Sequence, residues 1–160
     1  MTSIDRTKIS ALPDLIAKEP HNARDLQALA DRATAFLRRF DWSGTIEEIF
    51  AGITIGGVIG VFLFHIDPTD PSADHWLWVV AGDVPPAYLV TDDSPNPATA
   101  LEAYIDHMTL WVDAVKRGES VDDLMPVNAP ATAEYAGMLE SRLNFLKDKV
   151  LSRFSDDLST

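Results

Sequence analysis

A chain of 160 residues with 46% hydrophobic and 24% charged residues is long enough for one globular domain and too apolar for wholesale disorder. The absence of cysteine excludes disulfides, thiolate metal sites and cysteine nucleophiles. The net charge of −12 argues against nucleic acid as a partner, because phosphate binding needs clustered Lys and Arg. The first residues include an acid and no apolar run of the length that a signal peptide needs, so we expect a cytoplasmic protein.

The acidic charge is concentrated in the middle of the chain. No Lys or Arg lies between Arg39 and Lys116, and this stretch holds 12 of the 25 acids. They are Asp41, Glu47, Glu48, Asp67, Asp70, Asp74, Asp83, Asp92, Asp93, Glu102, Asp106 and Asp113. Such a segment is compatible with a basic protein partner, which opposite charge would attract. The alternative is that acids in loops only keep the protein in solution.

We expect the first 20 residues to be loosely ordered, with a weak helical turn near Pro13. Residues 23–40 then repeat apolar side chains at helical spacing, and Asn22 is a candidate N-cap. Residues 45–57 fit two structures. Capping-box spacing at residues 45–48 favours a short helix, whereas the pair Gly56-Gly57 would join a β-hairpin. We favour the helix.

Three segments rich in β-branched and aromatic residues follow, at residues 58–66, 75–81 and 87–91. Short loops between them predict an antiparallel meander, in which residues 58–66 form one edge. Pro86, directly before the last segment, predicts the other edge. The segments do not alternate apolar and polar residues, so both faces of the sheet should be covered.

The uncharged run at residues 49–64 is shorter than a membrane span and has no basic residue nearby, so we predict no span. Residues 97–117 and 132–154 are two more amphipathic helices. Asn96-Pro97 and Gly118 predict both ends of the first of them.

The predicted fold is a single α+β domain over residues 1–160. A three-stranded antiparallel meander packs with three long α-helices, comprising an N-terminal helical segment and two C-terminal helices. Three strands make a narrow sheet, so either the chain's own helices cover both faces or a second copy does. A homodimer is therefore our hypothesis.

The turn at residues 82–88 is the first candidate binding site. Asp83, Pro85, Pro86 and Tyr88 combine an acid, two rigid prolines and an aromatic ring, which suits a recognition loop. The alternative is that the prolines only protect a strand edge from aggregation.

Two tryptophans and three loop acids complete the predicted binding residues. Trp76 and Trp78 lie two apart, hence on one face of a strand, and such residues dominate interface hot spots. Burial under a helix is the alternative. Asp67, Asp70 and Asp74 lie in the loop before them and belong to the predicted acidic surface.

Metal binding has weak candidates. If residues 58–66 and 75–81 form a hairpin, His65, Asp67, Asp74 and His75 converge, and His with carboxylates ligates divalent cations. His65 with only a hydrogen-bond partner on a sheet face is the alternative. We predict no cofactor.

No nucleophile elbow, Walker loop, dinucleotide fingerprint or zinc-protease motif occurs, and we predict no catalytic residue. The favoured function is a non-enzymatic protein-interaction domain whose acidic central surface binds or neutralises a basic protein partner. The alternatives are a small-molecule or metal-dependent enzyme that uses His65, His75, His107 and nearby acids, or a ligand-binding module with an aromatic-walled pocket.

Overall fold

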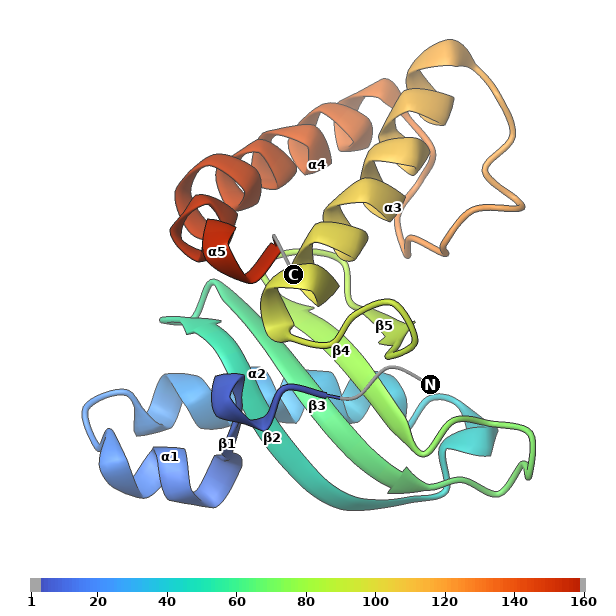
Figure 1. The fold of residues 1–160 in the computed structure, drawn as a ribbon. Helices are drawn as coiled ribbons and strands as arrows, with labels where there is room; N and C mark the ends of the chain where they lie inside the picture. Colours follow the sequence, from blue (N-terminus) through green and yellow to red (C-terminus); the bar gives the residue numbers. More distant parts are fainter. Residues whose placement is uncertain (1–3, 159–160) are drawn as a thin grey trace.

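The computed structural model describes residues 4–158. Five strands form one antiparallel sheet in which each strand lies beside its neighbours in sequence (Figure 1). The strands are β1 (Ser10–Ala11), β2 (Thr45–Ile55), β3 (Ile59–Asp67), β4 (Trp76–Gly82) and β5 (Ala87–Val90). The fold class is therefore α+β, as predicted, with five strands where three were expected.

Helices cover both faces of this sheet, with α1 and α2 on one face and α3 and α4 on the other (Figure 1). Their bounds are α1 (Leu12–Lys18), α2 (Ala23–Leu37), α3 (Pro97–Arg117), α4 (Ala133–Phe145) and α5 (Ser155–Leu158). A π-helical segment (Leu146–Val150) and a 3-10 helix (Leu151–Phe154) join α4 to α5, and shorter 3-10 helices occur at Arg6–Lys8 and Asp41–Ser43. From Ile4 onward, the segment that we expected to be loosely ordered thus contains three short elements.

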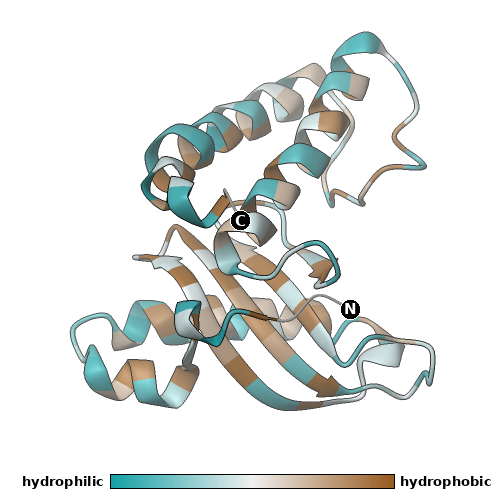
Figure 2. Ribbon diagram, in the orientation of Figure 1, coloured by the Kyte–Doolittle hydropathy of each residue, from teal (hydrophilic) through white to brown (hydrophobic). Residues whose placement is uncertain are grey.

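The core consists of two layers separated by β3. Val61 and Leu63 belong to the layer under α3, whereas Phe62 and Phe64 belong to the layer under α2. The central strands are accordingly hydrophobic at successive positions, while the helices carry hydrophilic residues outward (Figure 2). The prediction that both faces are covered is confirmed, and the chain's own helices provide the cover.

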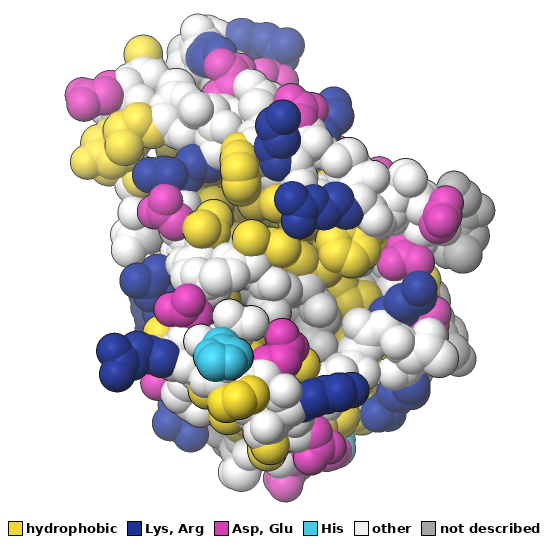
Figure 3. All heavy atoms as spheres, turned by 90° about the vertical axis from the view of Figure 1, so that its left-hand side faces the viewer, with side chains coloured by type: hydrophobic (Ala, Val, Ile, Leu, Met, Phe, Trp, Pro, Cys, Tyr) yellow, Lys and Arg dark blue, Asp and Glu magenta, His cyan; other side chains and the backbone are white. Residues whose placement is uncertain are grey.

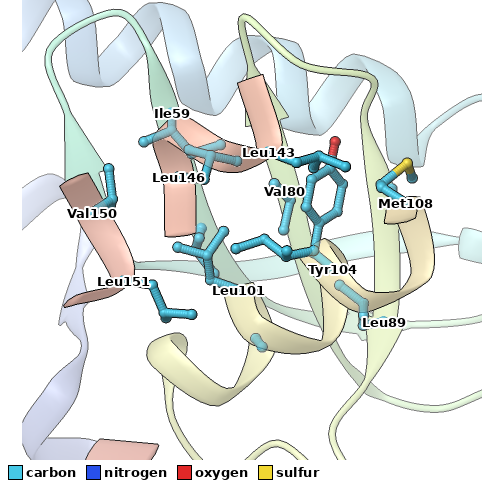
Figure 4. Packing of buried hydrophobic residues seen from close by; sticks show 14 of the residues in the cluster. Ile59, Val80, Leu89, Leu101, Tyr104, Met108, Leu143, Leu146, Val150 and Leu151 are labelled. Atoms are coloured by element: carbon cyan, nitrogen blue, oxygen red, sulfur yellow. The ribbon is translucent and has the colours of Figure 1, made fainter. Parts of the chain in front are cut away.

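Close to the sheet, the α3 layer is built from long side chains of three elements. Leu101, Tyr104 and Met108 of α3 point toward β4 and β5 (Figure 4). Leu143 and Leu146 reach the same cluster from α4 and the π-helical segment that follows it. This packing holds the α3–α4 pair over one end of the sheet.

The prediction of a helix over residues 45–57 is wrong, and the hairpin alternative is correct. These residues form β2 and its turn into β3, with Ile55 opposite Ile59 and Thr45 opposite Asp67. A shift of register between Ile46 and Glu48 marks a β-bulge. The local capping-box spacing was overridden by long-range pairing with an apolar strand that needed a partner.

The prediction that residues 58–66 form an edge is also wrong, because β3 is the middle strand of the five. The edge position predicted for β5 is confirmed. The ends of α3 are confirmed too, since Asn96 and Thr99 form a reciprocal capping box and Gly118 is left-handed. Asn22 occupies the N-cap of α2, but its side chain donates to Glu19 Oε1 (3.2 Å) instead of capping the helix.

Two glycines should respond to alanine in opposite directions. Gly82 has φ +137°, and a Cβ there would meet the Val58 carbonyl, so we expect Gly82→Ala to lower the unfolding free energy by about 2 kcal/mol or more. Gly137 lies inside α4 with open space around it, so Gly137→Ala should raise that free energy by about 0.5–1 kcal/mol. Urea denaturation measures both changes, and shifts of the same sign would contradict this account of the backbone.

Candidate binding surface

The loop of residues 82–86, which joins β4 to β5, contacts side chains of α2, α3 and α4. Four clefts border it: one includes Pro86, one includes Asp83 and Val84, one includes Pro85, and one includes residues 82, 84 and 86. We call the concave region made by these clefts the 82–86 surface. The turn predicted as a recognition loop is thus its centre.

The largest of these clefts, with a volume of about 850 Å³, includes Ala87 and Tyr88 at the start of β5 and is called the β5 groove. Residues 86–88 form its floor, and Phe36 of α2 and Phe40, just beyond the end of that helix, form one wall, called the α2 wall. Leu110 of α3 and residues 123–128 form the other. A mostly apolar lining with a few polar groups, at this volume, is typical of ligand and peptide sites.

Aromatic contacts hold the α2 wall of the groove in place. The Tyr88 ring packs edge-on against Phe40 and Trp42, with ring centroids 5.2 Å apart in both pairs. Phe36 packs edge-on against Phe40 at 5.3 Å. Edge-to-face pairs of this kind add to the free energy of burial. The Tyr88 side chain therefore forms part of a fixed wall.

Exposed apolar side chains gather on the 82–86 surface. Six large hydrophobic residues in the described part of the chain are 40–54% exposed, and five of them line its clefts. Those five are Val58, Leu110, Tyr135, Met138 and Phe145. Viewed from one side, hydrophobic side chains lie between the lobe of the C-terminal helices and the lobe of the sheet with α1 and α2 (Figure 3).

Helix α4 is apolar on two of its faces. Leu139 and Leu143 are buried under it, whereas Tyr135, Met138 and Phe145 are exposed. The exposed residues are three and seven apart, which places them on a second stripe of the same helix. The apolar stripe expected from the sequence joins Tyr135 to Leu139 and Leu143, but the structure buries only the two leucines and leaves Tyr135 exposed. The apolar residues at positions 138 and 145 were the signal in the sequence for a second stripe.

The loop of residues 82–86 is held from three helices. The buried Tyr104 hydroxyl of α3 donates to the Pro85 carbonyl at 2.5 Å, and Arg32 Nη1 of α2 donates to the Gly82 carbonyl at 3.2 Å. Arg142 of α4 pairs with Asp83, with 2.7 Å between Nη1 and Oδ2. Burial raises the pKa of the Tyr104 phenol far above its usual value, so this hydroxyl remains a donor.

The tryptophans predicted as binding residues have different environments. Trp78 is fully buried, and its Nε1 donates to the Ser94 carbonyl at 2.8 Å, so the burial alternative holds for it. Trp76 is half-buried and stacks on His65 with centroids 4.2 Å apart. The guanidinium group of Arg6 lies over the Trp76 ring, 4.8 Å from its centre. Neither tryptophan borders the four clefts.

The structure separates Asp83 from the other predicted acids. Asp67 is the last residue of β3, and Asp70 and Asp74 lie in the β3–β4 loop. All three are at the opposite end of β4 from Asp83, a span of about 20 Å for seven residues. The backbone N–H and the hydroxyl of Ser72 donate to Asp70 Oδ1 (2.9 and 2.8 Å) and lower the pKa of that carboxyl.

Antiparallel pairing brings further acids to the same place, because β2 begins, β3 ends, β4 begins and β5 ends there. A hydrogen bond from Thr69 N–H to the Trp42 carbonyl (3.0 Å) joins two of the loops. We call this region the acidic sheet end. Its acids are Asp41, Glu47, Glu48, Asp67, Asp70, Asp74, Asp92 and Asp93.

The predicted metal ligands do not assemble into a larger set. β3 and β4 form the expected hairpin, with His65 opposite Trp76. His65 Nδ1 lies 3.2 Å from Glu48 Oε1, and His75 is exposed. Within residues 4–158, no three His, Asp or Glu side chains are grouped so that they would hold a metal ion.

Comparison of the chain with models of known protein families, with curated proteins and with solved structures finds no match. Among the described residues, no helix has the length and hydrophobicity needed to cross a bilayer. Function must therefore be inferred from the chemistry of these surfaces.

The hydrogen bond from Tyr104 to the loop can be tested by removing one oxygen atom. We expect Tyr104→Phe to lower the unfolding free energy by about 1–2 kcal/mol, because the Pro85 carbonyl loses its partner. Tyr88→Phe is the matched control, since within residues 4–158 the Tyr88 ring makes aromatic contacts but its hydroxyl makes no hydrogen bond. Equal losses of stability in urea denaturation would contradict this assignment.

Proposed function

We propose that this chain is a non-enzymatic protein-interaction domain that binds a basic protein partner. The observation that supports this most directly is the gathering of five of the six exposed large hydrophobic side chains around one concave surface. Exposed apolar residues scattered singly carry no meaning, but a contiguous group marks an interaction site.

The residue types of the 82–86 surface support a protein partner. Aromatic residues, Met and Arg are enriched at protein interfaces. Tyr135, Met138 and Phe145 lie along one side of the surface, and Arg142 lies among them. The loop beneath is held from three helices, so little conformational entropy would be lost when a partner binds.

The charge distribution supports a basic partner. The chain carries −12, and eight of its acids lie at the acidic sheet end, which the β5 strand connects to the loop of residues 82–86. Opposite charge on a partner would raise the association rate and disfavour acidic competitors. If the chain covers the partner's own functional surface, binding would also inhibit the partner's activity.

A second candidate function is ligand binding. The volume of the β5 groove, about 850 Å³, and its aromatic wall favour it. The two functions differ in their dependence on salt, because only the protein-partner proposal relies on distant acids.

The apolar contribution can be tested with Leu110→Ser and Met138→Ser. Both side chains are at least half exposed, so the fold should tolerate the change, whereas we expect partner affinity to fall at least about tenfold. Arg117→Ser is the control, because Arg117 is exposed on α3 and borders none of the four clefts.

A partner is first isolated on the immobilised wild-type chain from an extract of the source cells, then purified and measured by calorimetry. The proposal requires a basic partner that the Leu110→Ser chain binds more weakly. A partner that is acidic, or one that all three variants bind equally well, would show that the 82–86 surface has another role.

The electrostatic contribution can be tested with the double variant Asp67→Asn, Asp74→Asn. We expect its association rate constant to fall about two- to fivefold at low salt and to match the wild type in 0.5 M salt, where charges are screened. Asp14→Asn with Asp31→Asn is the control, since these exposed acids lie on α1 and α2. Equal effects of the two pairs in stopped-flow measurements would mean that net charge, and not the acidic sheet end, matters.

A further inference from the structure

Strand β5 lies at the border of the sheet (Figure 1). In the described part of the chain it pairs with β4 and has no strand beside its other edge. Within residues 4–158, no other segment makes a backbone hydrogen bond to residues 87–90. The first two residues of this strand, Ala87 and Tyr88, line the β5 groove, and the strand continues beyond it to Val90. The groove therefore presents peptide N–H and C=O groups as well as apolar side chains.

The hydrogen bonds at the two ends of the β3–β4 pair show which groups face outward. The Ile66 N–H donates to the His75 carbonyl (2.8 Å), and the Asp83 N–H donates to the Val58 carbonyl (2.7 Å). Bonded and non-bonded pairs alternate along an antiparallel ladder. Odd-numbered residues of β4 therefore bond to β3, and its even-numbered residues bond to β5.

The β5 partners of those even-numbered residues are Leu89 and Ala87. Their N–H and C=O groups thus point into the sheet. The N–H and C=O groups of Tyr88 and Val90 point the opposite way, toward the open edge. Four hydrogen-bonding groups are in this way available along a strand about 13 Å long.

We propose that an extended segment of the partner adds to β5 as a sixth strand, with its backbone bonded to Tyr88 and Val90 and side chains in the β5 groove. The inference rests on the proposed function and names the way in which that partner binds. Strand addition obtains affinity from main-chain hydrogen bonds and specificity from pockets for alternate side chains. Small apolar ligands would leave the four outward backbone groups unused.

Charges at the two ends of β5 indicate the orientation and composition of the segment. Arg39 lies at the Pro86 end of the groove and makes no ion pair within residues 4–158, although it contacts the Phe36 ring. Asp92 and Asp93 are exposed just beyond the other end. An antiparallel segment would place its first residues near these acids and its last residues near Arg39. Lys or Arg should therefore come early in the segment, and an acid or a C-terminal carboxylate late.

A second copy of the chain fits this edge less well than a single segment. The first half of the β5 edge, at Ala87 and Tyr88, lies in the β5 groove, which the α2 wall and residues 123–128 also line. Two copies that approached edge to edge would bring these walls together before their β5 strands met. Two chains of −12 would also repel one another. An extended basic segment has neither obstacle.

The test uses a phage-displayed library of random decapeptides, selected on the immobilised full-length chain. The tightest peptides are synthesised and measured on Val90→Pro and Val90→Ala chains. Proline removes the outward N–H of residue 90 and leaves the β4–β5 hydrogen bonds, whereas alanine keeps that N–H. We expect the Val90→Pro chain to bind about five- to tenfold more weakly than the Val90→Ala chain, as for loss of one hydrogen bond.

A second measurement does not depend on the folding of the proline variant. Each peptide is N-methylated at one amide at a time and measured on the wild-type chain. Strand addition predicts that affinity falls at every second position, because only alternate amides face β5. Enriched peptides should also carry a base before the apolar core of the sequence.

Three results would overturn the proposal. The first is that no peptide is enriched on the immobilised chain. The second is that peptides bind the Val90→Pro and Val90→Ala chains with equal affinity and that N-methylation does not lower affinity at every second position. The third is that sedimentation shows a dimer of this chain that Val90→Pro dissociates. If the Leu110→Ser chain loses the natural partner while Val90→Pro retains it, the interaction function stands and strand addition does not.

Discussion

The pairing of β3 with strands on both sides is the constraint on which the rest of the structure depends. Its side chains alternate between two separate core layers, and Phe62 and Leu63 are both fully buried. A strand that is apolar on both faces is stable only when it has two neighbouring strands and two covering layers. Because β3 needs a neighbouring strand on each side, residues 45–55 pair with it as β2. Because both of its faces are apolar, α2 covers one face of the sheet and α3 covers the other.

The same arrangement creates the 82–86 surface. Although α2 and the α3–α4 pair cover opposite faces of the sheet (Figure 1), each of these helices sends a side chain to the turn from β4 into β5. Contacts from Tyr104, Arg32 and Arg142 fix that turn. A rigid loop at the base of a concavity lets exposed apolar residues from distant segments act together. The acidic sheet end lies at the other end of β4, so in the proposed function apolar contact and electrostatic attraction would come from different parts of the domain.

The open edge of β5 connects these two regions. A strand edge is normally a liability, and here it is limited by its length of four residues, by Pro86 before it and by the walls of the groove. The same walls can prevent unspecific pairing and still permit selective pairing, because they would exclude the edge of another sheet but admit a single extended chain. In the proposed strand addition, the acids that follow β5 would extend this selectivity to the charge of the segment.

The sequence by itself determined the α+β class, the antiparallel order of β3, β4 and β5, the cover on both sheet faces and long helices near residues 23–37 and 97–117, because each depends on local periodicity, turn chemistry or a run of apolar residues. It predicted a third long helix over residues 132–154, of which only Ala133–Phe145 is α-helical. It did not determine the pairing of residues 45–55, the position of β3 or the grouping of the acids, which depend on contacts between distant segments. Tyr135 and Phe145 illustrate the difference. Their spacing is visible in the sequence, but only the tertiary structure decides which stripe of α4 meets the core and which remains exposed. Packing makes that decision, because the sheet buries one face of a helix and leaves the other to a partner or to water.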